Sequence, residues 1–114
     1  MILTREQILS FDDLRKEKLS VPEWGGDVFI RVMNGIERDA YEEWASSAGK
    51  SLKGIRGRLA ALCLVNEAGE RLFSDEDVDA LGKKSAAALE RVVTAAMKLN
   101  AVTSEDVKEL EKNS

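Results

Sequence analysis

The chain of 114 residues has no histidine, one cysteine, one proline and only 5% aromatic residues. Without histidine it lacks a common zinc ligand and the side chain that most often acts as a general base near neutral pH. The single thiol, Cys63, cannot form a disulfide within the chain, which is typical of a reducing compartment. We therefore expect no enzymatic activity, no cofactor and no metal site.

Long hydrophobic runs are also missing. No stretch approaches the roughly 18 consecutive apolar residues of a membrane span. The N-terminus, Met-Ile-Leu-Thr-Arg-Glu, lacks the charged and then apolar layout of a secretion signal. These two features predict a cytoplasmic protein with no membrane contact.

The residues that are present fit a single folded domain over residues 1–114. The composition is 44% hydrophobic and 33% charged, with a net charge of -4 at pH 7. This apolar fraction is near the globular average, and the charge is too small to predict disorder. An acidic chain, with a pI of about 5.0, is also a poor candidate for binding nucleic acid.

The first signal along the chain is that of a short helix. Thr4 and Gln7 have the spacing of a capping box, in which the hydroxyl and the Gln side chain each accept a hydrogen bond from the other residue's backbone. This pattern predicts a helix from about Arg5 to Ser10. Phe11 follows directly, and we expect its ring to close the helix onto the core.

A β-hairpin is predicted next, over residues 18–33. Two segments rich in apolar residues flank a turn at Gly25 and Gly26, as in a pair of antiparallel strands. Pro22 has no N–H for a strand ladder, so the first strand should lie at an edge of the sheet or end there. One face of the second strand carries Val28, Ile30 and Val32.

Helical periodicity dominates the rest of the chain. It predicts helices from about Ile36 to Ser47, from Leu52 to Val65, from Ser74 to Gly82 and from Ser85 to Asn100. The expected core positions of the first two helices are Ile36, Ala40, Tyr41, Trp44, Ala48, Leu52, Ile55, Leu59, Leu62 and Cys63. Those of the last helix are Leu89, Val92, Val93, Ala96 and Met97.

Two features complete this helical region. Leu72 and Phe73 are expected to return to the core after a turn at residues 66–71. Gly57, inside the second helix, costs about 1 kcal/mol relative to Ala unless a neighbour packs closely against it. The predicted fold class is thus α+β, mainly helical with one N-terminal β-hairpin. It divides into a short helix plus hairpin (1–33), a helical core (34–100) and a short C-terminal helix or tether (101–114).

Two motif fragments suggest ligands but fail on spacing. Gly49-Lys50-Ser51 ends like a phosphate-binding loop, yet Trp44 stands where the first glycine of that loop belongs. Asp75, Asp77 and Asp79 alternate as in a calcium loop, but position 80 is Ala where the turn glycine belongs. We interpret both fragments as ordinary loop and helix-start residues.

Two surfaces are candidates for interaction. The first is a run of four basic residues with no acid between Glu43 and Glu67, and it is either a solvated helix face or a docking surface for an acidic partner. The second is surplus apolar surface on the last helix, with Trp24 at the hairpin turn as another contact. The candidate residues are Trp24, Lys50, Lys53, Arg56, Arg58, Ala88, Ala95 and Leu99.

The order of these elements resembles the tail assembly chaperones of long-tailed, non-contractile bacteriophages and prophages. The resemblance covers nearly the whole chain, and it rests on the order of its elements, since each one alone is ordinary. The segments that carry it are residues 1–9, the Val21-Pro22-Glu23-Trp24-Gly25-Gly26 hairpin followed by residues 28–32, and residues 35–42, 69–77 and 81–89.

This resemblance implies a non-enzymatic role in the host cytoplasm. Copies of the chain would form oligomers that coat the tape measure protein and keep it soluble until tail tube subunits polymerise around it, and would be absent from the mature virion. A programmed frameshift near Lys112 and Asn113 would yield a longer form that recruits tail tube protein. The alternative is a structural tail component, similar to a terminator or connector, that stays in the particle.

Overall fold

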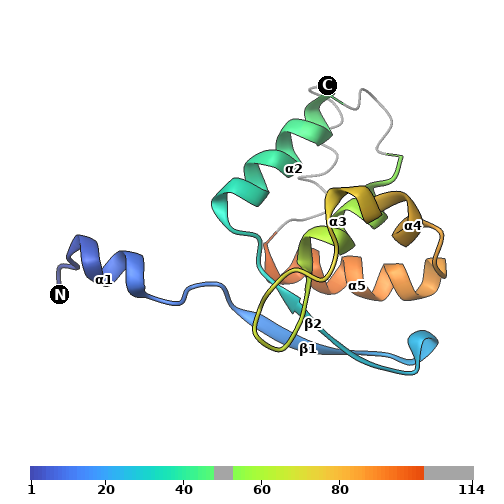
Figure 1. Cartoon of the computed structure of the whole chain (residues 1–114), viewed down its shortest axis with the longest axis horizontal. Helices are drawn as coiled ribbons and strands as arrows, with labels where there is room; N and C mark the ends of the chain where they lie inside the picture. The colour runs from blue at the N-terminus through green and yellow to red at the C-terminus, as the bar shows by residue number, and fades with distance from the viewer. Residues whose placement is uncertain (48–52, 102–114) are drawn as a thin grey trace.

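The computed structural model describes residues 1–47 and 53–101, which form a helical body on a small sheet, with an N-terminal arm (Figure 1). The predicted α+β class, mainly helical with an N-terminal hairpin, is confirmed. The elements are α1 (Arg5–Ser10), β1 (Lys16–Val21), the 3-10 turn η1 (Pro22–Trp24), β2 (Gly26–Arg31), α2 (Gly35–Ser47), α3 (Ile55–Cys63), β3 (Leu64–Val65), the 3-10 turn η2 (Asp75–Asp77), α4 (Val78–Gly82) and α5 (Ala86–Leu99).

The sheet is antiparallel, with strand order β1-β2-β3, so β1 lies at an edge as Pro22 predicted. The hairpin register pairs Lys16 with Arg31 and Val21 with Gly26. Its tip differs from the predicted two-glycine turn, because η1 makes the connection and only Gly25 has a left-handed backbone, with φ 75°. At this tip the Trp24 side chain packs against the core of the helical body.

Helix α3 is the centre of the core. Leu59, Ala60 and Cys63 are almost fully buried, and α3 packs against both α4 and α5. Gly57 makes the approach to α4 possible, because a Cβ there would lie 2.6 Å from the carbonyl oxygen of Val78. Helix α5 in turn packs against both strands of the hairpin, so it joins the sheet to α3 (Figure 1).

The end of α3 differs from the prediction. The helix was expected to continue to Val65, but Leu64 and Val65 form β3, which pairs with Ile30 and Phe29 of β2. Both residues are about 1% exposed. A continuous run of apolar residues is compatible with a fully buried helix and with an inner strand. Hydrophobic periodicity therefore could not distinguish the two structures. The predicted helix start at Leu52 lies outside the described residues.

Helix α2 is rotated relative to the predicted stripe. Tyr41 and Ala45 are buried and Trp44 is half-buried, whereas Ile36 is 81% exposed and Ala40 is also exposed. Ile36 and Ala40 were therefore wrong as core positions, and Ala48 lies outside the described residues. The rotation follows from the helix start, where Glu37 turns inward to a buried arginine, Arg31.

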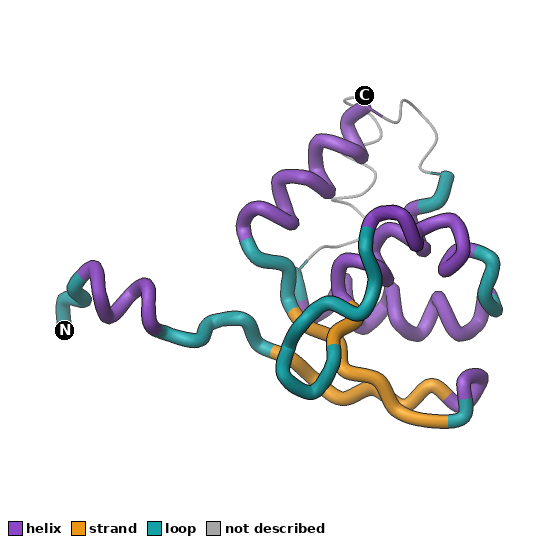
Figure 2. The backbone as a smooth tube through the Cα atoms, viewed as in Figure 1, coloured by secondary structure: helices purple, strands orange, loops and turns teal. Residues whose placement is uncertain are grey.

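Two aromatic or aliphatic side chains predicted to reach the core do not reach it. Phe11 is 74% exposed because α1 stands away from the body on an extended connection (Figure 2). Leu72 is 53% exposed, while its neighbour Phe73 is half-buried and packs against the core. The backbone N–H of Leu72 donates to the Leu64 carbonyl, which places successive side chains on opposite sides. The predicted C-terminal helix after Thr103 lies outside the described residues.

Candidate interaction surfaces

A buried ion pair holds the hairpin, α2 and the loop at residues 66–73 together. Arg31 is only 8% exposed, and its Nη2 donates to Glu37 Oε1 at 2.5 Å. Its Nη1 donates to the carbonyl of Gly69 at 3.0 Å. Arg71 Nε lies 4.0 Å from the other Glu37 oxygen and donates to the Ala61 carbonyl at 3.1 Å. Sequence reasoning missed this cluster, because in the sequence its members are scattered charged residues.

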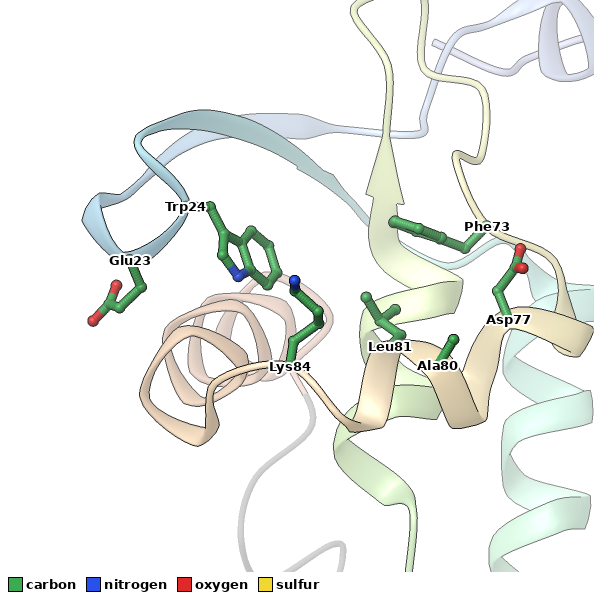
Figure 3. A pocket seen from close by; sticks show the side chains of 7 residues that line it. All are labelled: Glu23, Trp24, Phe73, Asp77, Ala80, Leu81 and Lys84. Carbon is green, nitrogen blue, oxygen red and sulfur yellow. The ribbon is translucent and has the colours of Figure 1, made fainter.

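The hairpin tip and α4 enclose a hollow of about 560 Å³ (Figure 3). Its floor is apolar and its rim is charged, as at a site that holds an apolar side chain and orients it by polar contacts. The indole Nε1 of Trp24 is buried and has no hydrogen-bond partner among the described residues. The residues that line the hollow are Glu23, Trp24, Phe73, Asp77, Ala80, Leu81 and Lys84.

An ion pair fastens this tip to α5. Arg91 Nε donates to both oxygens of Glu23, at 2.8 and 3.0 Å. A backbone hydrogen bond at Glu23, together with the Arg91 side chain, lowers the pKa of the Glu23 carboxyl. The carboxylate therefore stays charged in mildly acidic solution. The tip is held in place while Trp24 remains half-buried rather than fully exposed.

The basic run does not form one surface. Lys53 and Arg56 line a second hollow, of about 340 Å³, together with Lys84. Arg56 also pairs with Glu90 at 3.0 Å. Arg58 instead lies over the ring of Trp44, with its guanidinium carbon 4.8 Å from the ring centroid, so this cation packs against α2. Lys50 lies outside the described residues. Since Lys84 lines both hollows, the apolar and the basic site are neighbours.

The apolar surface of α5 is narrower than predicted. Ala88 is 0% exposed and belongs to the core, so it is not available on the surface of the protomer. Ala95 and Leu99 are half-buried. Ala95 lines a shallow and mainly apolar groove of about 570 Å³, which runs along α5 beside β1. The groove is lined by Leu19, Glu23, Ala87, Glu90, Arg91, Thr94, Ala95 and Lys98.

Cys63 is a buried thiol, as predicted. Removal from water raises its pKa to about 12, well above the ordinary value of 9.0. The Nδ2 of Asn100 lies 3.6 Å from its Sγ. A thiol with so high a pKa is a poor nucleophile at neutral pH.

The described residues contain neither a metal-binding cluster nor a membrane-spanning helix. In residues 1–47 and 53–101, no group of three acidic or cysteine side chains is placed to hold a metal ion. Over the same residues, no helix combines the length and the apolar character that a membrane crossing requires. The features that this part of the chain presents are hollows, a groove and an apolar arm.

The family of the chain is decided by its sequence. A model of the phage tail assembly chaperone family matches residues 5–113. The chain belongs to this family. The tail assembly chaperone of bacteriophage HK97 has a similar structure, with a TM-score of 0.63 and 18% sequence identity, over 82% of this chain and 90% of that chain. At this identity the likeness shows the fold. No curated protein matches the sequence.

Proposed function

We propose that this phage tail assembly chaperone coats the tape measure protein, keeps it soluble and helps to recruit tail tube subunits. The observation that carries the proposal is the pair of adjacent hollows, one apolar at Trp24 and one basic at Lys53 and Arg56, joined by Lys84. A helix with apolar and acidic side chains fits such a surface through both burial and charge.

The apolar hollow supplies the binding free energy in this proposal. Trp24, Phe73 and Leu81 bring apolar atoms to one place, and burying one large apolar side chain there contributes about 1.5–3 kcal/mol. The nearby lysines then select clients with acidic side chains.

Co-expression with the tape measure protein tests the proposal. We expect the double change Lys53→Glu and Arg56→Glu to reduce the amount of tape measure protein that co-purifies. Lys18→Glu, on the exposed edge strand and away from both hollows, is the matched control and should leave it unchanged. If the double variant retains full co-purification and melts like the wild type, the two hollows do not bind the client. Arg58 is left unchanged, because its contact with Trp44 makes a change there ambiguous.

The same proposal includes a place and a fate for the protein. The chaperone acts in the host cytoplasm, self-associates through α5 and leaves before the virion matures. A longer form made by frameshifting carries the tube-recruiting domain. Mass spectrometry of infected cells should find the longer product, and synonymous recoding of Lys112 and Asn113 should abolish it. Detection of the 114-residue chain in purified virions would instead favour a structural tail component.

A further inference from the structure

The N-terminal arm is the largest apolar feature that the body of the protein leaves uncovered. It projects from the start of β1, away from the helices (Figures 1 and 2). It is rare for so many adjacent apolar side chains to be exposed to solvent together. The exposed fractions are 99% for Met1, 92% for Ile2, 55% for Leu3, 58% for Ile8, 67% for Leu9 and 74% for Phe11.

This arm has a defined structure and an apolar side. The Thr4 and Gln7 capping bonds are both formed, at 3.2 and 2.9 Å. At about 100° per residue, Ile8, Leu9 and Phe11 fall within about half of the helix circumference. A helix of six residues is only marginally stable in water by itself, so a surface that covers this side would stabilise it.

The groove along α5 has the size and chemistry to cover it. Its apolar lining consists of Leu19, Ala87 and Ala95, and the small alanines leave room for bulky side chains of a partner. The span from Ala87 to Lys98 is about 17 Å at 1.5 Å per residue, whereas the six residues of α1 need about 9 Å.

Charges at the two surfaces are complementary. Asp12 and Asp13 follow Phe11 directly. Lys98 stands on the rim of the groove and makes no ion pair with any described residue. An arm that lies in the groove with Phe11 toward this end places the two carboxylates near the Lys98 ammonium. The other charges of the rim, Glu23 with Arg91 and Glu90 with Arg56, already neutralise one another.

We propose that the arm of one copy docks in the α5 groove of a second copy. This inference deepens, and rests on, the proposed self-association through α5. In the structure the arm projects away from the helical body that contains α5 (Figure 1), so a neighbour supplies the cover. Since arm and groove are different surfaces, each copy offers one of each, and the contact propagates into a ring or an open chain of copies. Such a contact suits a protein that covers a long client.

Two variants with opposite defects test the exchange. Phe11→Glu places a charge on the apolar side of the arm and leaves the groove unchanged. Thr94→Glu places a charge in the groove and leaves the arm unchanged. Both positions are exposed, so neither change disturbs the core. Light scattering after size exclusion should give a single-chain mass for each variant, under conditions where the wild type is larger. The dissociation constant should rise about tenfold or more, as expected for a charge placed in an apolar contact.

Mixing the two variants is the decisive measurement. The arm of Thr94→Glu can still enter the groove of Phe11→Glu, so an equimolar mixture should form a species of two chains and no larger one. Glu6→Lys changes a charge on the other side of α1, outside the hollow that Phe11 lines, and should assemble like the wild type. A shortened chain without residues 2–11 should behave like Phe11→Glu.

Three results would overturn the inference: a monomeric wild type, an unchanged mass for Phe11→Glu, or a mixture that stays monomeric. All of these assays use the purified chaperone without a client. Failure of self-association is therefore distinguishable from failure of client binding. A Phe11→Glu variant that is monomeric but still co-purifies with the tape measure protein would demonstrate that the two are separate.

Discussion

Helices α1 and α3 are both short, yet their surroundings are opposite. α1 has six residues and a complete capping box, and none of its residues is buried. α3 has nine residues and starts after Gly54 with no side-chain cap, and most of its residues are buried. Capping and pattern thus specify where a helix forms, whereas burial is decided by what the rest of the chain brings to it.

The difference between the two helices is one of partners. α3 meets α4, α5 and α2, and Gly57 allows the closest of these contacts. The arm meets no such layer within the described body, so its apolar side chains remain available for another molecule. Stability should therefore depend on α3 and its neighbours, and association on the arm.

The sharpest contrast is expected in thiol labelling. Cys63 is buried with a raised pKa of about 12, so it reacts only when the core opens. In the variant Ser10→Cys, the new thiol lies on the exposed arm and should be labelled at once. We expect native Cys63 to react at least about a thousandfold more slowly, as its opening costs several kcal/mol. Alkylation with and without denaturant, followed by mass spectrometry, measures the ratio.

The raised thiol pKa also gives a pH dependence. The pKa of Cys63 is about 12 in the folded state, against its ordinary value of 9.0. A group whose pKa is raised by folding stabilises the fold at low pH, and this contribution is lost as the pH rises. The midpoint of urea unfolding should therefore fall above about pH 9 more steeply in the wild type than in Cys63→Ala. Equal pH dependence of the urea midpoint in the wild type and in Cys63→Ala would show that folding does not raise the pKa of the thiol.

The next largest effect is expected at the buried ion pair. Glu37→Ala leaves the guanidinium of Arg31 without its carboxylate, in a site where Arg31 is 8% exposed. Loss of one partner from a buried pair costs about 3–5 kcal/mol. Glu42→Ala, which removes the exposed partner of Arg38, is the control and should cost no more than about 0.5 kcal/mol. Similar unfolding free energies for the two variants would contradict the structure.

A smaller loss is expected at the contact between α3 and α4. Gly57→Ala places a Cβ 2.6 Å from the Val78 carbonyl oxygen, so the two helices must move apart, at a cost of about 1–3 kcal/mol. Gly82→Ala is the matched control, because its Cβ would meet no heavy atom within 4 Å. Thermal melting of both variants decides the point. A neutral or stabilised Gly57→Ala would mean that helix propensity outweighs the contact.

Sequence reasoning succeeded where local rules decide the structure. The capping box at Thr4, the hairpin with β1 at the edge and the helix start at Ser85 were all predicted and confirmed. Each depends on residues a few positions apart, so the pattern itself contains the information. The family resemblance was confirmed as well, because it rests on the order of such local elements.

It failed where a long-range partner decides burial. Phe11 and Leu72 look like core residues but are exposed, and the β3 residues look like the end of a helix until β2 is placed beside them. The contact of Arg58 with Trp44 joins two helices, and the sequence pattern of the basic run does not contain it. Burial of Ala88 could not be read from periodicity, which does not say how far neighbouring elements wrap around α5.

The smallest effect on folding is expected from the arm. Phe11→Ala removes a large aromatic side chain that is 74% exposed in the protomer. In dilute solution, where copies are separate, it should change the unfolding free energy by less than about 0.5 kcal/mol. Leu59→Ala, at a side chain that is 1% exposed, should cost about 2–5 kcal/mol. Denaturant titration at two protein concentrations measures both: a loss for Phe11→Ala that appears only at the higher concentration assigns the ring to a contact between copies, whereas a large loss at both concentrations places it in the core after all.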